Sequence, residues 1–134
     1  MSTFEEWLTE WADEIEQAQL FTKSALPVNH LDIQKDLSRT TTEYPRMAEL
    51  LAEVEGHIVT ARAVETLAVK KDSQYGELSA PERKTVVEAR LVAIMRTRDI
   101  LKATVAALHG RSFVLLNQRR FAEAEMRMAP HSEG

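Results

Sequence analysis

The 134-residue chain contains no cysteine, which excludes disulfide bonds, thiolate metal sites and catalytic cysteines. Glycine and proline are scarce, with four of each. The alternating β-branched and aromatic residues of a sheet are missing as well, whereas Ala, Glu, Leu, Arg and Val, most of which favour helices, predominate. The composition therefore predicts an all-α protein, and the length predicts a single domain over residues 1–134.

Long apolar runs are also absent. No run approaches the roughly 20 apolar residues that a membrane-spanning helix needs. The N-terminal stretch MSTFEEWLTEWADEIEQ is acidic and amphipathic, unlike the basic and then apolar pattern of a secretory signal. We therefore expect a cytoplasmic protein that makes no membrane contact.

The spacing of the apolar residues predicts four to five helices. They are expected over residues 4–22, 30–39, 45–71, 80–109 and 112–128. Pro45 suits the first turn of a helix, and Gly110 is a natural left-handed stop after the fourth helix. Gly56 lies inside the third helix, where it indicates a close approach by another helix.

Two of the predicted helices dominate the expected architecture. Helices 45–71 and 80–109 should form a long antiparallel hairpin inside a helical core over 30–128. An acidic amphipathic helix within 1–23 precedes this core, and 129–134 should be a frayed tail. Small chains with long amphipathic helices commonly bury their remaining apolar stripes against copies of themselves, so we expect a homo-oligomer.

Charge is unevenly distributed, although the net charge is only −4. Residues 1–56 carry 12 acidic and 4 basic side chains, whereas residues 57–134 carry 9 acidic and 13 basic ones. Such an asymmetry indicates either a nucleic-acid contact through the basic half or two halves that pack together and neutralise each other. The sequence leaves both interpretations open.

The predicted helix 80–109 has an arginine inside its apolar stripe. This stripe consists of Val87, Leu91, Ile94, Leu101, Val105 and Leu108. Arg98 occupies a position within it, and Arg83 and Arg90 lie in the same arc. Burying an unpaired guanidinium is very costly, so Arg98 should meet a carboxylate, water or an anionic partner. The position either sets the register between helices or forms part of a mixed apolar and basic surface that contacts phosphate.

The stretch LHGRSFVLLNQRRF, residues 108–121, places three more arginines beside apolar side chains. If the basic half binds single-stranded nucleic acid, the arginines of both regions contact phosphate while Phe113 and Phe121 stack or pack. The predicted nucleic-acid-binding residues are Arg83, Arg90, Arg98, Arg111, Arg119 and Arg120.

Aromatic side chains are few, and three of them share one face of the first predicted helix: Phe4, Trp7 and Trp11. Core packing is the default interpretation of such a stripe. The alternative is an anchor for another subunit, because aromatic residues are enriched in protein interfaces. These three residues, with Phe113 and Phe121, make up the predicted protein interface.

Signals for catalysis and metal binding are poor. The chain has no P-loop, no Gly-rich dinucleotide motif, no HExxH and no recognisable Ser/His/Asp arrangement. Glu49, Glu53 and His57 share one helical line, but a di-iron helix requires Glu-x-x-His, and position 54 is valine. A solvated acidic face is the preferred interpretation. We expect no enzymatic activity, no metal, no cofactor and no small-molecule substrate.

The layout from about residue 45 to residue 125 resembles phage recombination mediators of the UvsY type. The resemblance is carried by the long helix 45–71, a loop ending in Tyr75-Gly76, KTVVEARLVAIM at 84–95 and GRSFVLLNQRRFAEAE at 110–125, in which Arg111, Phe113 and Phe121 match the family outline. It implies a small helical protein that forms rings, binds single-stranded DNA and helps to load a recombinase in the host cytoplasm.

Two functional hypotheses follow. The leading one is a non-enzymatic accessory protein that binds single-stranded nucleic acid through its basic C-terminal half, with itself, single-stranded DNA and a recombinase or other protein as partners. The alternative is a phage-type assembly, scaffold or inhibitor protein that acts only through protein contacts. Salt-sensitive nucleic-acid binding would favour the first hypothesis.

Overall fold

The computed structural model describes residues 3–128, and these residues form helices and connecting turns without a β-strand. Four α-helices occur in the order α1 (Phe4–Lys23), α2 (His30–Lys71), α3 (Ala80–Arg90) and α4 (Val92–Met128), with a short 3-10 helix at Ser73–Tyr75. The expected all-α class is confirmed. The tail predicted at 129–134 lies outside the described residues.

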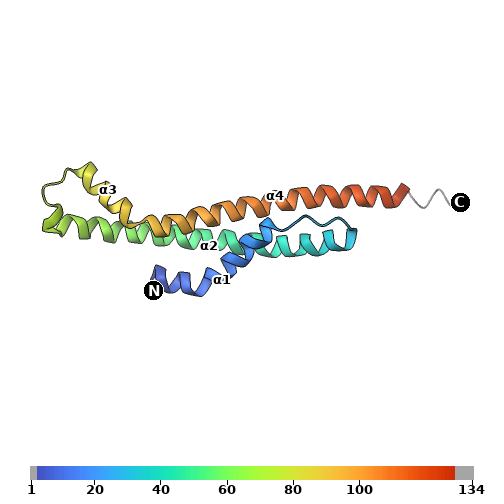
Figure 1. Cartoon of the computed structure of the whole chain (residues 1–134), viewed down its shortest axis with the longest axis horizontal. Helices are drawn as coiled ribbons and strands as arrows, with labels where there is room; N and C mark the ends of the chain where they lie inside the picture. Colours follow the sequence, from blue (N-terminus) through green and yellow to red (C-terminus); the bar gives the residue numbers. More distant parts are fainter. Residues whose placement is uncertain (1–2, 129–134) are drawn as a thin grey trace.

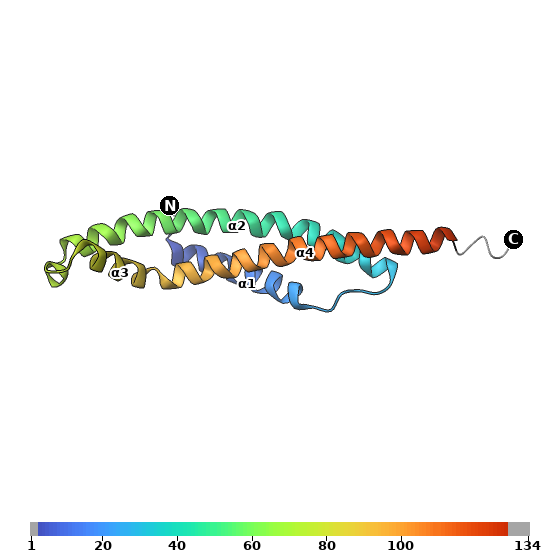
Figure 2. The same ribbon diagram turned by 90° about the horizontal axis from the view of Figure 1, so that it is seen from above.

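The molecule is a rod built on two long helices. α2 and α4 run antiparallel along most of its length, and α3 packs beside the far end of α2 (Figure 1). α1 lies against the middle of this pair, and an extended linker carries the chain from α1 to the start of α2 (Figure 2). The predicted hairpin is therefore present, but its helices begin and end at different residues.

The prediction that a new helix starts at Pro45 is wrong, because α2 continues through this residue. Three threonines, Thr40, Thr41 and Thr42, precede the proline. The hydroxyl of each donates to the backbone carbonyl four residues earlier. These bonds are compatible with a helix. Thr40 and Met47 are fully buried on either side of Pro45. Packing thus holds both segments in one helix in spite of the hydrogen bond that proline removes.

The prediction of one helix over 80–109 is also wrong. The chain turns at Leu91, which has φ −96° and ψ 2° and separates α3 from α4. Leu91 is fully buried in a cluster with Val69 and Val87, so the turn places the apolar face of α3 against the end of α2. No glycine or proline marks this break, and tertiary packing is its physical cause.

The predicted stop at Gly110 does not occur, because α4 continues through it to Met128. Gly110 does not adopt a positive φ, and a Cβ added there would meet nothing within 4 Å. Gly56 has the same open surroundings, so the close helix approach predicted at this position is wrong within the single chain.

The main core lies where α1 meets the α2–α4 pair. It contains residues from all three helices: Trp7, Ile15, Ala18, Phe21, Met47, Leu50, Val54, Leu101 and Leu108. A smaller cluster of Ile33, Leu37 and Leu115 continues it toward the start of α2. Ser79 and Glu82 form a complete capping box, with both reciprocal bonds, and it starts α3.

Candidate interaction surfaces

Arg111 is a buried structural residue in the structure. Its side chain is 5% exposed, and its Nε and Nη2 donate to the Asp36 carboxylate of α2 at 2.7 and 2.6 Å. Nη1 donates to the carbonyl of Ser24 and Nη2 to that of Ala25, in the linker after α1. The guanidinium also lies 4.6 Å from the centroid of the Phe21 ring. Because these contacts engage every guanidinium nitrogen and the side chain is buried, Arg111 connects three segments and is not accessible to phosphate.

Three other predicted nucleic-acid ligands are engaged by carboxylates of the same chain. Arg90 pairs with Glu65, Arg98 with the adjacent Asp99, and Arg119 with Glu123 at 3.8 Å. The bond to Glu65, followed by the bond to Tyr75, raises the pKa of Arg90 above its ordinary value. Arg98 is 25% exposed, so it extends to the surface and is not sealed inside an apolar seam.

The predicted neutralisation of the two halves is carried by one direct ion pair. Among the pairs formed by residues 3–128, only Arg111–Asp36 joins the acidic segment 1–56 to the basic segment that follows. The remaining pairs lie within one segment or the other. The uneven distribution of charge along the sequence therefore did not indicate which acidic and basic side chains form ion pairs.

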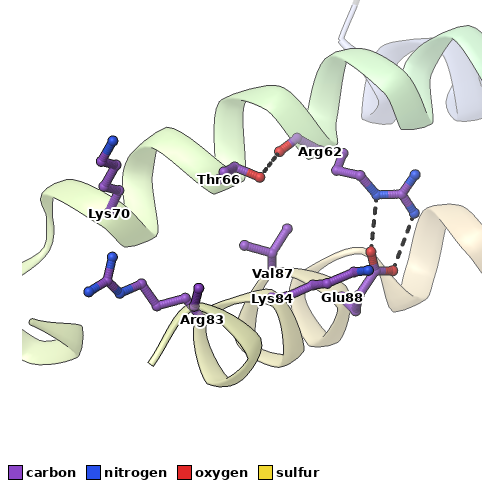
Figure 3. Close-up of a pocket in the computed structure, with 8 residues that line it drawn as sticks. Arg62, Thr66, Lys70, Arg83, Lys84, Val87 and Glu88 are labelled. Atoms are coloured by element: carbon purple, nitrogen blue, oxygen red, sulfur yellow. Dashed lines mark hydrogen bonds and ion pairs between the residues drawn. The ribbon is translucent and has the colours of Figure 1, made fainter. Parts of the chain in front are cut away.

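Arg83 and Arg120 form no ion pair within residues 3–128. Arg120 is exposed on α4. Arg83 lies in a pocket of about 680 Å³ between α2 and α3, where Lys70, Lys84 and Arg62 add further positive charge (Figure 3). The sequence pattern singles out neither Lys70 nor Lys84, because nothing in it brings the two helices together at this end.

The N-terminal aromatic residues mainly serve the core. Trp7 is 4% exposed, donates from Nε1 to Glu53 Oε2 at 3.0 Å and stacks near Phe4 and His57. Trp11 is half-buried beneath the guanidinium of Arg46, whose centre is 4.5 Å from the ring centroid. Glu53 and His57 are thus part of this packing, and no group of three metal-ligand side chains forms among the described residues.

The C-terminal part of α4 presents exposed aromatic side chains. Phe113 and Phe121 are 65% and 67% exposed, and they line an apolar groove with Leu26 and Val28 of the linker. The floor of the groove includes the buried Ile33. These two phenylalanines are therefore accessible, and their role in a protein interface stays a prediction.

α2 has a second apolar face, opposite its core-facing side, that sequence reasoning did not single out. Residues spaced by 4, 3, 4 and 4 positions fall on one helical line and are all exposed: Ala52, Gly56, Val59, Ala63 and Leu67. Val59 and Leu67 are 69% and 56% exposed. The residues that pack α2 into the fold, such as Val54 and Ile58, lie on the other side. We call these five residues the outer α2 face.

No helix among residues 3–128 combines the length and apolarity that a membrane crossing requires. Comparisons of the chain with known protein families, with curated proteins and with solved structures give no match.

Proposed function

We propose that this chain is a non-enzymatic assembly protein that functions as a homo-oligomer, with a second copy seated on the outer α2 face. The observation that carries the proposal is that α2 is apolar on two opposite sides, and the fold covers only one of them. A helix that is apolar on both sides needs two partners. The small side chains at positions 52, 56 and 63 permit close approach of another helix.

Charge complementarity favours an antiparallel copy. Glu55 and Arg62 lie on the same flank of the outer α2 face, seven residues apart. In an antiparallel two-fold packing centred between residues 58 and 59, each flank meets the same flank of the partner, so Glu55 opposes the second copy's Arg62. Glu55 is exposed and forms no ion pair within residues 3–128. Arg62 pairs with Glu88 through Nε and Nη2, and its side chain is still 44% exposed.

The mass in solution tests this proposal. Light scattering at micromolar concentration should give about twice the 15.2 kDa of one chain. Val59→Glu buries a charge in the proposed interface and should return the protein to a single chain. Val64→Glu is the matched control, because Val64 is 58% exposed but lies off the outer α2 face. A wild-type protein that stays at 15.2 kDa, or equal effects of the two substitutions, would refute the proposal.

The identity of the interface can be tested separately. Glu55→Lys places like charges opposite each other in the antiparallel arrangement and should weaken association by about tenfold, an effect that decreases with added salt. Association unchanged by this substitution would exclude the antiparallel register centred at residues 58 and 59.

Single-stranded nucleic-acid binding in the manner of a recombination mediator is the second candidate. It is supported by Arg120, which is exposed and forms no ion pair within residues 3–128, and by the cluster at Arg83. We place it second because Arg90, Arg98, Arg111 and Arg119 are engaged within the chain. Binding of a short oligonucleotide that falls steeply with salt would support it, and a matched loss on Arg120→Glu would locate the contact.

A further inference from the structure

The pocket between α2 and α3 concentrates positive charge that the fold does not neutralise. Its walls come from α2 with Arg62, Thr66 and Lys70, and from α3 with Arg83 and Lys84. Arg62 is held by two bonds to Glu88, the only carboxylate among the described residues that line the pocket. Lys70, Arg83 and Lys84 form no ion pair within residues 3–128. Three cationic side chains therefore remain uncompensated around one cavity.

Arg83 adds an observation of a different kind. Its Nε is buried and has no hydrogen-bond acceptor among the described residues. A buried donor without an acceptor is costly, so the Arg83 side chain gains a hydrogen bond if it rotates and presents Nε to an acceptor supplied by a ligand. Figure 3 shows the Arg83 guanidinium extending toward the end of α2 that carries Lys70, whose ammonium group points away from Arg83 in this view. An anion bound beside Arg83 would therefore also be contacted by Lys70 once the flexible lysine side chain rotates toward it.

The lining also has an apolar part. Val87, which is buried, lies in the middle of the pocket, and Ala80 lies at the start of α3 (Figure 3). The volume of about 680 Å³ is within the range of pockets for small molecules. The site thus combines an anion-binding end with a less polar surface between two helices, which suits a small molecule better than a polymer lying across the outside.

We propose that this pocket binds a small molecule that carries a diphosphate group, with the phosphates at the end lined by Arg83 and Lys70 and a less polar part over Val87. A single phosphate carries about −1.5 to −2 charges at pH 7, so three uncompensated cations match two linked phosphates better than one. This inference does not require the assembly role, although Arg62 lines the pocket and also flanks the outer α2 face.

Calorimetric titration of the full chain with adenosine diphosphate, inorganic pyrophosphate and adenosine tests the proposal. We expect saturable binding of the first two at one site per chain and no binding of adenosine. Binding of both diphosphates identifies the diphosphate as the recognised group, whereas binding of the nucleotide alone shows that the pocket also recognises the nucleoside. The proposal is overturned if neither diphosphate binds saturably, or if only an eight-residue single-stranded oligonucleotide binds.

A variant pair locates the site. Lys70→Gln combined with Arg83→Gln should weaken diphosphate binding at least tenfold. Arg96→Gln combined with Lys102→Gln removes the same charge from exposed positions outside the pocket and should leave binding unchanged. Equal losses in both variants would mean a nonspecific charge effect and would overturn the site. Circular dichroism checks the fold of each variant, and amide shifts of residues 66–70 and 80–88 on titration of the wild type provide a readout that needs no variant.

Discussion

The guanidinium of Arg111 and the carboxylate of Asp36 form a two-pronged ion pair that connects α4 to α2, with N–O distances of 2.7 and 2.6 Å. Their side chains are 5% and 13% exposed, so the pair is largely removed from water. Arg111 also donates to two carbonyls in the linker after α1. One residue thereby holds together the three segments that meet at this end of the core.

Replacing Arg111 by alanine should destabilise the fold by about 3–5 kcal/mol, because Asp36 is left as a largely buried charge without its partner. Urea unfolding followed by circular dichroism, at one protein concentration for all variants, measures the change. Arg96→Ala is the control, since Arg96 is exposed and unpaired within residues 3–128, and its cost should stay within about 0.5 kcal/mol. Equal costs for the two variants would contradict the structural role of Arg111.

The double variant Arg111→Met with Asp36→Leu tests the same pair from the other direction. It removes both charges and leaves no buried ion uncompensated, so its cost should be smaller than the sum of the two single substitutions. Additive costs would show that the two side chains do not interact in solution.

The two tryptophans should differ in the free energy that each contributes. Trp7 is 4% exposed and hydrogen-bonded to Glu53, so Trp7→Ala should cost about 3–5 kcal/mol of unfolding free energy. Trp11 is half-buried and should cost less. Urea unfolding measures both. Fluorescence gives an independent readout, because a Trp11→Phe variant that retains Trp7 should emit at shorter wavelength than the reverse variant. Identical spectra would contradict the burial of Trp7.

The aromatic stripe and the capping box of α3 illustrate what the sequence predicts well. Both depend on local spacing, and the spacing of Trp7, Ile15 and Ala18 places them in the core as expected for one helical face. The reciprocal bonds of Ser79 and Glu82 follow from a three-residue separation. Local patterns of this kind can be predicted from the sequence because they do not depend on residues far away in the chain.

The helix boundaries and the interaction surfaces depend on residues that are distant in the sequence, so the spacing of residues did not predict them correctly. Pro45 lies inside a helix because buried residues on both of its sides hold the chain in the fold, and Leu91 ends a helix because burial turns the chain there. Arg111 pairs with Asp36, which is 75 positions away in the sequence. No local pattern could therefore show that Arg111 is a buried structural residue and not the predicted phosphate ligand. The pocket around Arg83 likewise exists only because α3 folds back on α2.

A substitution at Gly110 distinguishes a continuous helix α4 from a helix that stops at this residue. As an interior residue of α4 with open space at its Cβ position, it should be improved by alanine, with a gain of up to about 1 kcal/mol. A left-handed helix stop at this position would instead make alanine destabilising. Thermal or urea unfolding of Gly110→Ala therefore tests the continuity of α4. Gly76 is the contrasting case, because an added Cβ would lie 3.3 Å from the Ser73 carbonyl oxygen and should bring no gain.

The capping box of α3 makes a prediction about pH. The hydroxyl and then the backbone N–H of Ser79 donate to Glu82, and these bonds lower the pKa of the Glu82 carboxyl below its ordinary value. Because the folded pKa is below the unfolded one, the stabilisation is fully present above the ordinary glutamate range and is lost as pH falls through the lowered folded pKa. The start of α3 should therefore loosen in acid.

Carbon-detected NMR titration of the Glu82 carboxyl measures this directly. In Ser79→Ala the hydroxyl donor is lost, and the titration midpoint of Glu82 should rise toward the ordinary value of about 4.3. Thr85→Ala is the matched control, because the Thr85 hydroxyl donates to the Pro81 carbonyl in the same helix without contacting Glu82. If the Glu82 midpoint is the same in Ser79→Ala as in the wild type, the hydroxyl bond does not act on this carboxyl in solution. A rise in both variants would instead point to a general loss of α3, which circular dichroism at pH 7 would detect as lower helix content.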